Sequence, residues 1–232
     1  METGSAATSR FEPAPLAGKR VGADYEKSAD GSAEERALLT SDHDKALQAW
    51  SPDGKFLLYT TQDPKTLSDL WALPLDGDRK AFPVAQTSFD EVHAQFSPDG
   101  HWIAYASNET GRYEVYVQAF PKPAGKRRVS TEGGIYPRWR RDGRELYYVT
   151  LDNRLVAVPI QPSADGTLTA GEPSTLFQTH MIIGGNVGPT GVLSKAQYDV
   201  GPDGRFLILV SADDNSSTAI NLVLNWPAAL KK

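Results

Sequence analysis

The side chains of this sequence that are best suited to chemistry lie in four short polar segments, "SDHDKALQA", "FDEVHAQ", "GGIYPR" and "SKAQYD". They include two histidines and several carboxylates, which are ligands that divalent metal ions accept in proteins. A metal ion exposed to water generates hydroxide near neutral pH, which is the chemistry of a hydrolase acting on small esters or phosphoesters. The candidate metal ligands are His43, Asp44, Glu91 and His93. The wider set of candidate binding residues is His43, Asp44, Asp90, Glu91, His93, Tyr136, Arg138, Tyr198 and Asp199.

The same residue types also have a purely structural use. Asp and His side chains in loops cap turns and hydrogen-bond to neighbouring segments. No tight ligand spacing such as His-x-x-x-His is present to indicate a metal site. We therefore favour the structural role for these side chains and keep the metal site as an alternative.

Several other chemistries are excluded or disfavoured by the sequence. Cysteine is absent, which excludes disulfides, thiolate zinc sites and cysteine nucleophiles. There is no Gly-x-Ser-x-Gly motif for a serine hydrolase. The glycines of "MIIGGNVGPTGVLSKAQYD" lack the Gly-Lys-Ser/Thr ending of a phosphate-binding loop, so this segment is interpreted as a mobile loop over one mouth of the fold.

The candidate residues are positioned by a repeat that is built on a turn. The phrases of this repeat are "WSPDGKFLLYTT", "FSPDGHWIAYAS", "WRRDGRELYYVT" and "VGPDGRFLILVS". Their turn glycines, at spacings of 46, 43 and 61 residues, are Gly54, Gly100, Gly143 and Gly204. Because glycine accepts a positive φ, Asp-Gly indicates a tight turn between two strands. Self-similarity at about 40 to 50 residues is typical of the blades of a β-propeller.

The strand after each turn is apolar in all four copies. Three residues after the glycine stand Leu57, Ile103, Leu146 and Leu207. Two residues further on stand Tyr59, Tyr105, Tyr148 and Leu209. We also expect the repeat-matched aromatic residues to pack in the core between blades, namely Trp50, Trp102, Tyr105 and Trp139.

Each copy contains a third strand, such as "EVYVQ", and three copies contain a fourth, such as "STLF". A four-stranded antiparallel sheet with an apolar middle strand must cover both faces, and copies that stack around an axis do this for one another. We predict an all-β fold, a β-propeller of about four to five four-stranded antiparallel blades. The predicted blades lie near residues 46–85, 92–131, 135–178 and 196–226, within one domain over residues 21–232.

The two ends of the chain are predicted to complement each other. Residues 1–20 are rich in Ala, Gly, Ser and Pro and are predicted to be disordered, while residues 21–41 form a partial blade with "GADYEKSADG" and "ERALLTS" as strands. The last copy has no fourth strand. We expect residues 34–41 to pair with residues 218–226 and to close a ring of four blades, and the alternative is a homodimer through the same open blade edges.

These phrases resemble the blades of TolB-type, WD-repeat-like propellers, whose pattern is strand, "SPDG", strand and a third strand such as "SDLWAL". More narrowly, "AQFSPDGHWIAYASNETGRYEVYVQAFP" and the ending "LVLNWPAALKK" resemble the C-terminal propeller of bacterial receptor-type serine/threonine kinases. That resemblance implies a non-catalytic sensor or interaction domain outside the membrane, here truncated and without its kinase domain. The kinase motifs are missing from this sequence, so no kinase activity is implied.

Composition bears on three properties of the chain, namely nucleic-acid binding, membrane insertion and cellular location. Lys and Arg number 24 against 29 Asp and Glu, so the chain has no basic surplus for binding nucleic acid. It has no apolar run of about 18 residues and no secretory signal, which predicts no membrane insertion. The predicted location is cytoplasmic for the chain as written and extracytoplasmic if it is a fragment of a receptor kinase.

The predicted function is a non-catalytic binding or sensor propeller whose partner is a protein or a small-molecule ligand. This function requires no cofactor. The first alternative is the metal-assisted hydrolase, which requires a divalent metal at the mouth of the central channel. The second alternative is a structural fragment without independent function.

Overall fold

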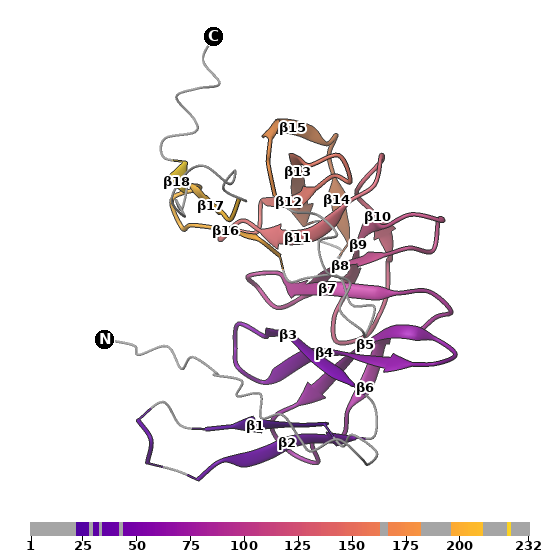
Figure 1. Ribbon diagram of the computed structural model, residues 1–232, viewed down its shortest axis with the longest axis vertical. Helices are drawn as coiled ribbons and strands as arrows, with labels where there is room; N and C mark the ends of the chain where they lie inside the picture. Colours follow the sequence, from indigo (N-terminus) through magenta and orange to yellow (C-terminus); the bar gives the residue numbers. More distant parts are fainter. Residues whose placement is uncertain are drawn as a thin grey trace, which may run out of the picture. The chain divides into compact units, whose positions relative to one another are not determined.

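The structure is a computed structural model that describes residues 22–27, 30–32, 34–41, 44–162, 167–181, 196–210 and 222–223 (Figure 1). Within these ranges the chain forms strands and turns and no helix, which confirms the predicted all-β class. Accordingly, none of the described segments is a helix long and apolar enough to cross a membrane. The chain divides into two compact units, residues 1–46 and residues 47–232.

The smaller unit contains a strand pair. Strand β1 (Gly22–Glu26) pairs antiparallel with β2 (Arg36–Ser41), so the two predicted N-terminal strands are present. The predicted pairing of residues 34–41 with residues 218–226 stays a prediction, because only residues 222 and 223 of the second segment are among those described. The segment 1–20 and the greater part of the predicted loop "MIIGGNVGPTGVLSKAQYD", residues 182–195, lie outside the described residues.

Four antiparallel sheets follow one another along the rest of the chain (Figure 1). The first sheet has the order β3-β4-β5-β6, with strands Lys45–Trp50, Phe56–Asp63, Leu67–Pro74 and Phe82–Ala85. The second has the order β7-β8-β9-β10, with strands Glu91–Phe96, Trp102–Ser107, Glu114–Ala119 and Arg127–Arg128. Each sheet is a meander in which the predicted first, second, third and fourth strands are neighbours in space.

The third sheet begins with β11 (Ile135–Trp139), β12 (Glu145–Val149) and β13 (Arg154–Pro162). Strand β13 is long enough to pair with two further strands, β14 (Leu168–Ala170) at its C-terminal end and β15 (Ser174–Gln178) at its N-terminal end. The predicted fourth strand "STLF" corresponds to β15, whereas β14 was not predicted. The last sheet contains β16 (Tyr198–Val200), β17 (Phe206–Ile208) and β18 (Leu222–Val223).

The hydrogen bonds of the Ser-Pro-Asp-Gly turn explain why these residue types are repeated in the sequence. In the first sheet the Ser51 hydroxyl donates to Asp53 Oδ1 at 2.6 Å and accepts from the Phe56 amide at 2.9 Å. The Gly54 amide donates to the Ser51 carbonyl oxygen at 2.9 Å, and Gly54 has a φ of 71°. Serine, aspartate and glycine therefore each have a separate role, since the first two hold the turn and the third supplies its left-handed residue.

The core lies between successive sheets. Leu58 and Leu70 of the first sheet pack against Ile103 and Tyr105 of the second. On its other face, the second sheet packs against the third in the same way. Trp102 and Tyr105 are buried and Trp139 is half-buried, but the expectation for Trp50 is wrong, because this side chain is 42% exposed. Its repeat equivalent Phe96 is buried in the core that the second sheet forms with the first.

The register of the last sheet differs from the prediction. Phe96 faces Ile103 in the second sheet, whereas the equivalent Val200 faces Phe206 rather than Leu207. The turn is one residue tighter, since the Gly201 amide donates to the Arg205 carbonyl oxygen. A slip of one residue exchanges the two faces of a strand. Consequently Phe206 is buried in the core, while Leu207 is 48% exposed and Leu209, just beyond the strand, is 58% exposed.

Candidate functional site

The innermost strands β7 and β11 share an irregularity that sets the direction of their side chains. The register shifts between Val92 and Gln95 in β7, and between Ile135 and Arg138 in β11. At these bulges His93 has a φ of 59° and Tyr136 has a φ of 56°. A left-handed backbone at a residue other than glycine costs about 1 kcal/mol or more, and bulges of this kind often redirect side chains near functional sites.

The two bulged residues contact each other across the sheets. The rings of His93 and Tyr136 lie 4.4 Å apart between centroids, with their planes at 61°. The Tyr198 hydroxyl of the last sheet donates to the Tyr136 carbonyl oxygen at 2.8 Å. All three side chains are buried, so the bulges connect three successive sheets.

Burial also controls the charge of His93. Desolvation, with a contribution from the nearby Arg138 guanidinium, lowers the pKa of His93 to about 3. The imidazole is therefore neutral over the physiological range. Its Nε2 atom is buried and has no hydrogen-bond partner among the described residues.

At the N-terminal end of β7, acidic side chains are enclosed by the protein. We call Thr66, Asp69, Gln86, Thr87 and Glu91 the Glu91 cluster. Glu91 is 0% exposed, and its Oε1 accepts from the Thr87 hydroxyl at 2.5 Å. Asp69 Oδ2 accepts from the Thr66 hydroxyl at 2.7 Å and from Gln86 Nε2 at 3.2 Å. Asp69 Oδ1 and Glu91 Oε2 are buried without a hydrogen-bond partner in the described part of the chain.

This environment favours the protonated form of Glu91. Burial, together with the negative charge of Asp69, raises the pKa of Glu91 to about 7, although the Thr87 hydrogen bond and Lys126 act in the opposite direction. A carboxylic acid at this position holds a proton at mildly acidic pH. Asp69 and Glu91 themselves are buried, so they do not offer these oxygens to an external ligand.

Asp90, the neighbour of Glu91, joins segments of two sheets. Its Oδ2 accepts from Asn108 Nδ2 at 3.2 Å and from the Tyr113 hydroxyl at 3.1 Å. Its Oδ1 accepts from the Ser68 amide at 3.2 Å. Both carboxylate oxygens of Asp90 therefore accept hydrogen bonds from neighbouring segments. This is the structural role that the sequence analysis favoured for the polar side chains in these loops.

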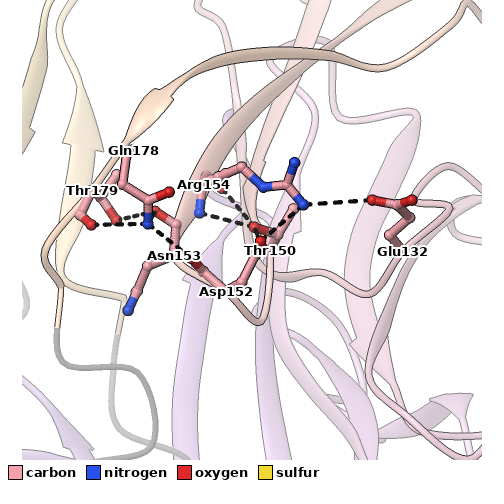
Figure 2. A network of polar contacts seen from close by, with 7 residues as sticks. All are labelled: Glu132, Thr150, Asp152, Asn153, Arg154, Gln178 and Thr179. Atoms are coloured by element: carbon pink, nitrogen blue, oxygen red, sulfur yellow. Dashed lines mark hydrogen bonds and ion pairs between the residues drawn. The ribbon is translucent and has the colours of Figure 1, made fainter.

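The turn between β12 and β13 is another polar network of this kind, and Figure 2 shows how its side chains converge. The Thr150 hydroxyl donates to Asp152 Oδ1 at 2.6 Å, and Arg154 Nη2 lies 2.9 Å from Asp152 Oδ2 and 3.5 Å from Glu132 Oε2. The Thr179 hydroxyl donates to the Asn153 carbonyl oxygen at 2.7 Å, which ties the turn to the residue after β15. These contacts hold the turn and connect it to the segment after β15.

The C-terminal ends of the innermost strands differ, because they surround a cavity of about 510 Å³. Its lining includes residues of β7, β11 and β16, which are the first strands of three successive sheets. Two smaller cavities, of about 490 and 450 Å³, lie between successive turns of the repeat. The cavity at the ends of the innermost strands, which we call the Arg138 pocket, is lined by Gln95, Phe96, Pro98, Arg138, Trp139, Ala196, Tyr198 and Asp199.

Arg138 is the one cation that lines this pocket. Its Nη1 donates to the Pro137 carbonyl oxygen at 3.1 Å, and its Nε lies 4.0 Å from Asp199 Oδ1. A separation of 4.0 Å is too long for a hydrogen bond. The Arg138 side chain is 21% exposed and that of Asp199 is 79% exposed, so both reach solvent at the pocket.

The predicted site residues are thus separated into groups. Arg138, Tyr198 and Asp199 line the pocket, and His93 and Tyr136 lie buried next to these residues. Asp90 and Glu91 lie at the opposite end of β7. Asp44 is exposed in the smaller unit, and His43 lies outside the described residues. Among the residues that are described, no group of three His, Asp or Glu side chains could hold a metal ion, and the complete predicted metal set stays a prediction.

The sequence contained a signal for the lining residues that were missed. Gln95, Arg138 and Asp199 each stand five residues before a turn glycine, and the first sheet has Ala49 at this position. One repeat position therefore supplies an amide, a guanidinium and a carboxylate to one cavity. Phe96 and Trp139 follow directly, and Trp139 had been assigned to the core alone.

Comparison with known proteins supports the fold. No protein-family model matches the chain, and no curated protein matches its sequence significantly. Among solved structures, TolB from Acinetobacter baumannii matches with a TM-score of 0.60 at 16% identity, over 84% of this chain and 44% of that one. A puromycin-hydrolysing peptidase from Mycobacterium tuberculosis matches with a TM-score of 0.59 at 19% identity, over 80% and 31%. An oligogalacturonate lyase in complex with manganese matches with a TM-score of 0.52 at 15% identity, over 79% and 49%.

These matches show a TolB-like β-propeller fold. In each case the chain spans less than half of the length of the structure that it resembles. The three proteins differ in what they do, and a shared fold at this level of identity does not decide between binding and catalysis. The function must therefore be argued from the site.

Proposed function

We propose that this chain is a non-catalytic binding propeller whose ligand or partner occupies the Arg138 pocket. The observation that carries the proposal is the joint construction of this pocket by the innermost strands of three successive sheets. Its volume of about 510 Å³ lies in the usual range for small-molecule sites. Its lining combines three aromatic side chains with Gln95, Arg138 and Asp199, and the surface that it exposes is more polar than apolar.

The resemblance of the repeat phrases to kinase-associated sensor propellers supports the same function. A sensor domain recognises a ligand or a protein segment and needs no catalytic group of its own. On this proposal Gln95 and Arg138 supply polar contacts, and Phe96, Trp139 and Tyr198 supply apolar surface. A protein partner would insert a side chain or a chain end into the pocket.

A binding screen on matched variants tests the proposal. Small molecules and short peptides are screened by thermal shift on the wild-type protein, and the binders are measured again on Gln95→Ala and Arg138→Gln. Arg141→Gln is the control, because it removes the same charge from the chain. Arg141 is exposed and does not line the pocket. We expect binders whose affinity falls in the two pocket variants and persists in the control. Binders that respond equally in all three variants would overturn the proposal.

The metal-assisted hydrolase and the homodimer remain as predictions beside this function. The hydrolase predicts bound divalent metal that is lost in His43→Ala and His93→Ala together with any esterase or phosphoesterase turnover. Elemental analysis and a substrate panel on both variants test it. Light scattering tests the dimer.

A further inference from the structure

Most of the hydrogen-bonding capacity of Arg138 is unused within the described part of the chain. A guanidinium group has five N–H donors in a planar fork. In the described structure one of them is used in a hydrogen bond, from Nη1 to the Pro137 carbonyl oxygen. The ion pair with Asp199, at 4.0 Å from Nε, does not occupy a donor at hydrogen-bond distance. A partly buried cation with this many free donors is suited to an anionic ligand that approaches in the plane of the fork.

Asp199 marks the place that such an anion would take. It is the only carboxylate among the residues lining the pocket. Its Oδ1 also accepts from the Val200 amide at 2.9 Å, which holds the carboxylate back toward its own strand. Because its side chain is 79% exposed, it loses little by moving away from Arg138.

The other walls select what is attached to the anion. Phe96 and Tyr198 are largely buried aromatic side chains, and Trp139 is half-buried. The Tyr198 hydroxyl is engaged with the Tyr136 carbonyl oxygen, so Tyr198 presents its ring rather than a free hydroxyl to the pocket. The Gln95 side chain, from the neighbouring sheet, adds the one amide side chain of the lining.

We propose that the Arg138 pocket binds a carboxylate carried on an aromatic or apolar group, with the ligand carboxylate replacing Asp199 as the partner of Arg138. This inference rests on the proposed function and names its ligand class. A planar carboxylate matches the guanidinium fork through two parallel N–H to oxygen hydrogen bonds. The attached group then lies against the aromatic walls. The carboxylate has two sources, a free aromatic acid or the C-terminus of a peptide.

The test uses probes that differ only in the charge of this group. Phenylacetate is compared with phenylacetamide, and N-acetyl-Ala-Phe is compared with its C-terminal amide, by ligand-observed NMR titration at pH 7. We expect each acid to bind the wild-type protein about tenfold or more tightly than its amide, as a charge-assisted bidentate pair would give. If the peptide acid binds more tightly than phenylacetate, a peptide C-terminus is the source, and the reverse order indicates a free acid.

Three variants assign the effect to individual residues. Arg138→Gln should abolish the preference for acid over amide, and Arg141→Gln should preserve it. Asp199→Asn should raise the affinity for both acids several-fold, because the competing carboxylate is removed. Unchanged denaturation midpoints establish that each variant is folded.

The carboxylate inference and the proposed function fail in different ways. Equal binding of acids and amides, both weakened by Gln95→Ala, would overturn the carboxylate inference and leave the pocket as a binding site. Acid binding that Arg138→Gln does not change would overturn it as well. The proposed function itself fails if the binders found in the wider screen respond to the pocket substitutions no more than to Arg141→Gln.

Discussion

The two ends of the innermost strand β7 differ in how far the charged side chains near them are accessible to a ligand. At its N-terminal end the Glu91 cluster encloses two carboxylates, and Glu91 is 0% exposed. At its C-terminal end the Arg138 pocket leaves a guanidinium with unused donors beside a cavity of about 510 Å³. Charge alone therefore does not indicate a binding site. A group is available to a ligand where the protein leaves both space and hydrogen-bonding capacity.

The largest effect that we expect concerns Glu91 and would sharpen this contrast. The pKa of Glu91 is raised from 4.5 to about 7, so its stabilising protonated form is fully present below about pH 4.5 and is lost as the pH rises to about 7. Glu91→Gln keeps the shape without the charge. It should stabilise the protein at pH 8 by up to about 3 kcal/mol and by little at pH 4, measured by urea denaturation. Destabilisation at pH 8 that becomes smaller at pH 4 would mean that Glu91 is bound as a carboxylate.

His93, between the two ends, should give the opposite pH dependence. Its pKa is lowered from 6.5 to about 3, so its contribution is fully present above pH 6.5 and is lost as the pH falls toward 3. His93→Asn tolerates the left-handed backbone and cannot be protonated in this range. Between pH 7 and pH 5, protonation of His93 on unfolding should lower the free energy of unfolding of the wild-type protein by about 2 kcal/mol. The variant should not show this decrease. Parallel stability curves for the two proteins would refute the buried neutral imidazole.

Packing at the closed end should be intolerant of added atoms. A Cβ atom at Gly134, just before β11, would lie 2.8 Å from Tyr148 Cδ2 and 3.1 Å from Ser130 Cβ. Gly134→Ala should therefore cost about 1 kcal/mol or more. Chemical denaturation measures this cost. An unchanged midpoint would show that this end of the sheet is looser than the structure indicates.

The smallest stability effect is expected in the open pocket. Gln95 is half-buried and lines the cavity, so Gln95→Ala should change the free energy of unfolding by less than about 1 kcal/mol. The same variant should weaken ligand binding in the screen. A large loss of stability would place Gln95 in the structural framework and would break the contrast between the ends.

The fold could be predicted further than the site. Ser51, Asp53 and Gly54 form a turn whose hydrogen bonds depend on their own side chains and backbone, so their spacing identified the strands directly. The expectation for Trp50 was wrong, and the repeat did not reveal that Leu207 is exposed, because burial depends on the register of a neighbouring strand and on which sheet covers a side chain. Neither is encoded at the residue itself.

The site was located only in part for a similar reason. Sequence analysis selected Arg138 and Asp199 from the segments before the turns, but it grouped them with Glu91 and Asp90, which lie at the other end of the strands. Residue types identify which groups are charged. Which end of a strand is closed by neighbouring side chains and which end opens into a cavity follows from tertiary packing.

Hydrogen exchange with a bound ligand tests the central claim most directly. A binder from the screen is added at saturation, and amide exchange is followed by mass spectrometry over the whole chain. We expect slower exchange in peptides that cover residues 95–101, 136–144 and 196–205, around the Arg138 pocket, and no change at residues 84–91. Protection that is confined to residues 84–91 would place the ligand at the Glu91 cluster and contradict the account.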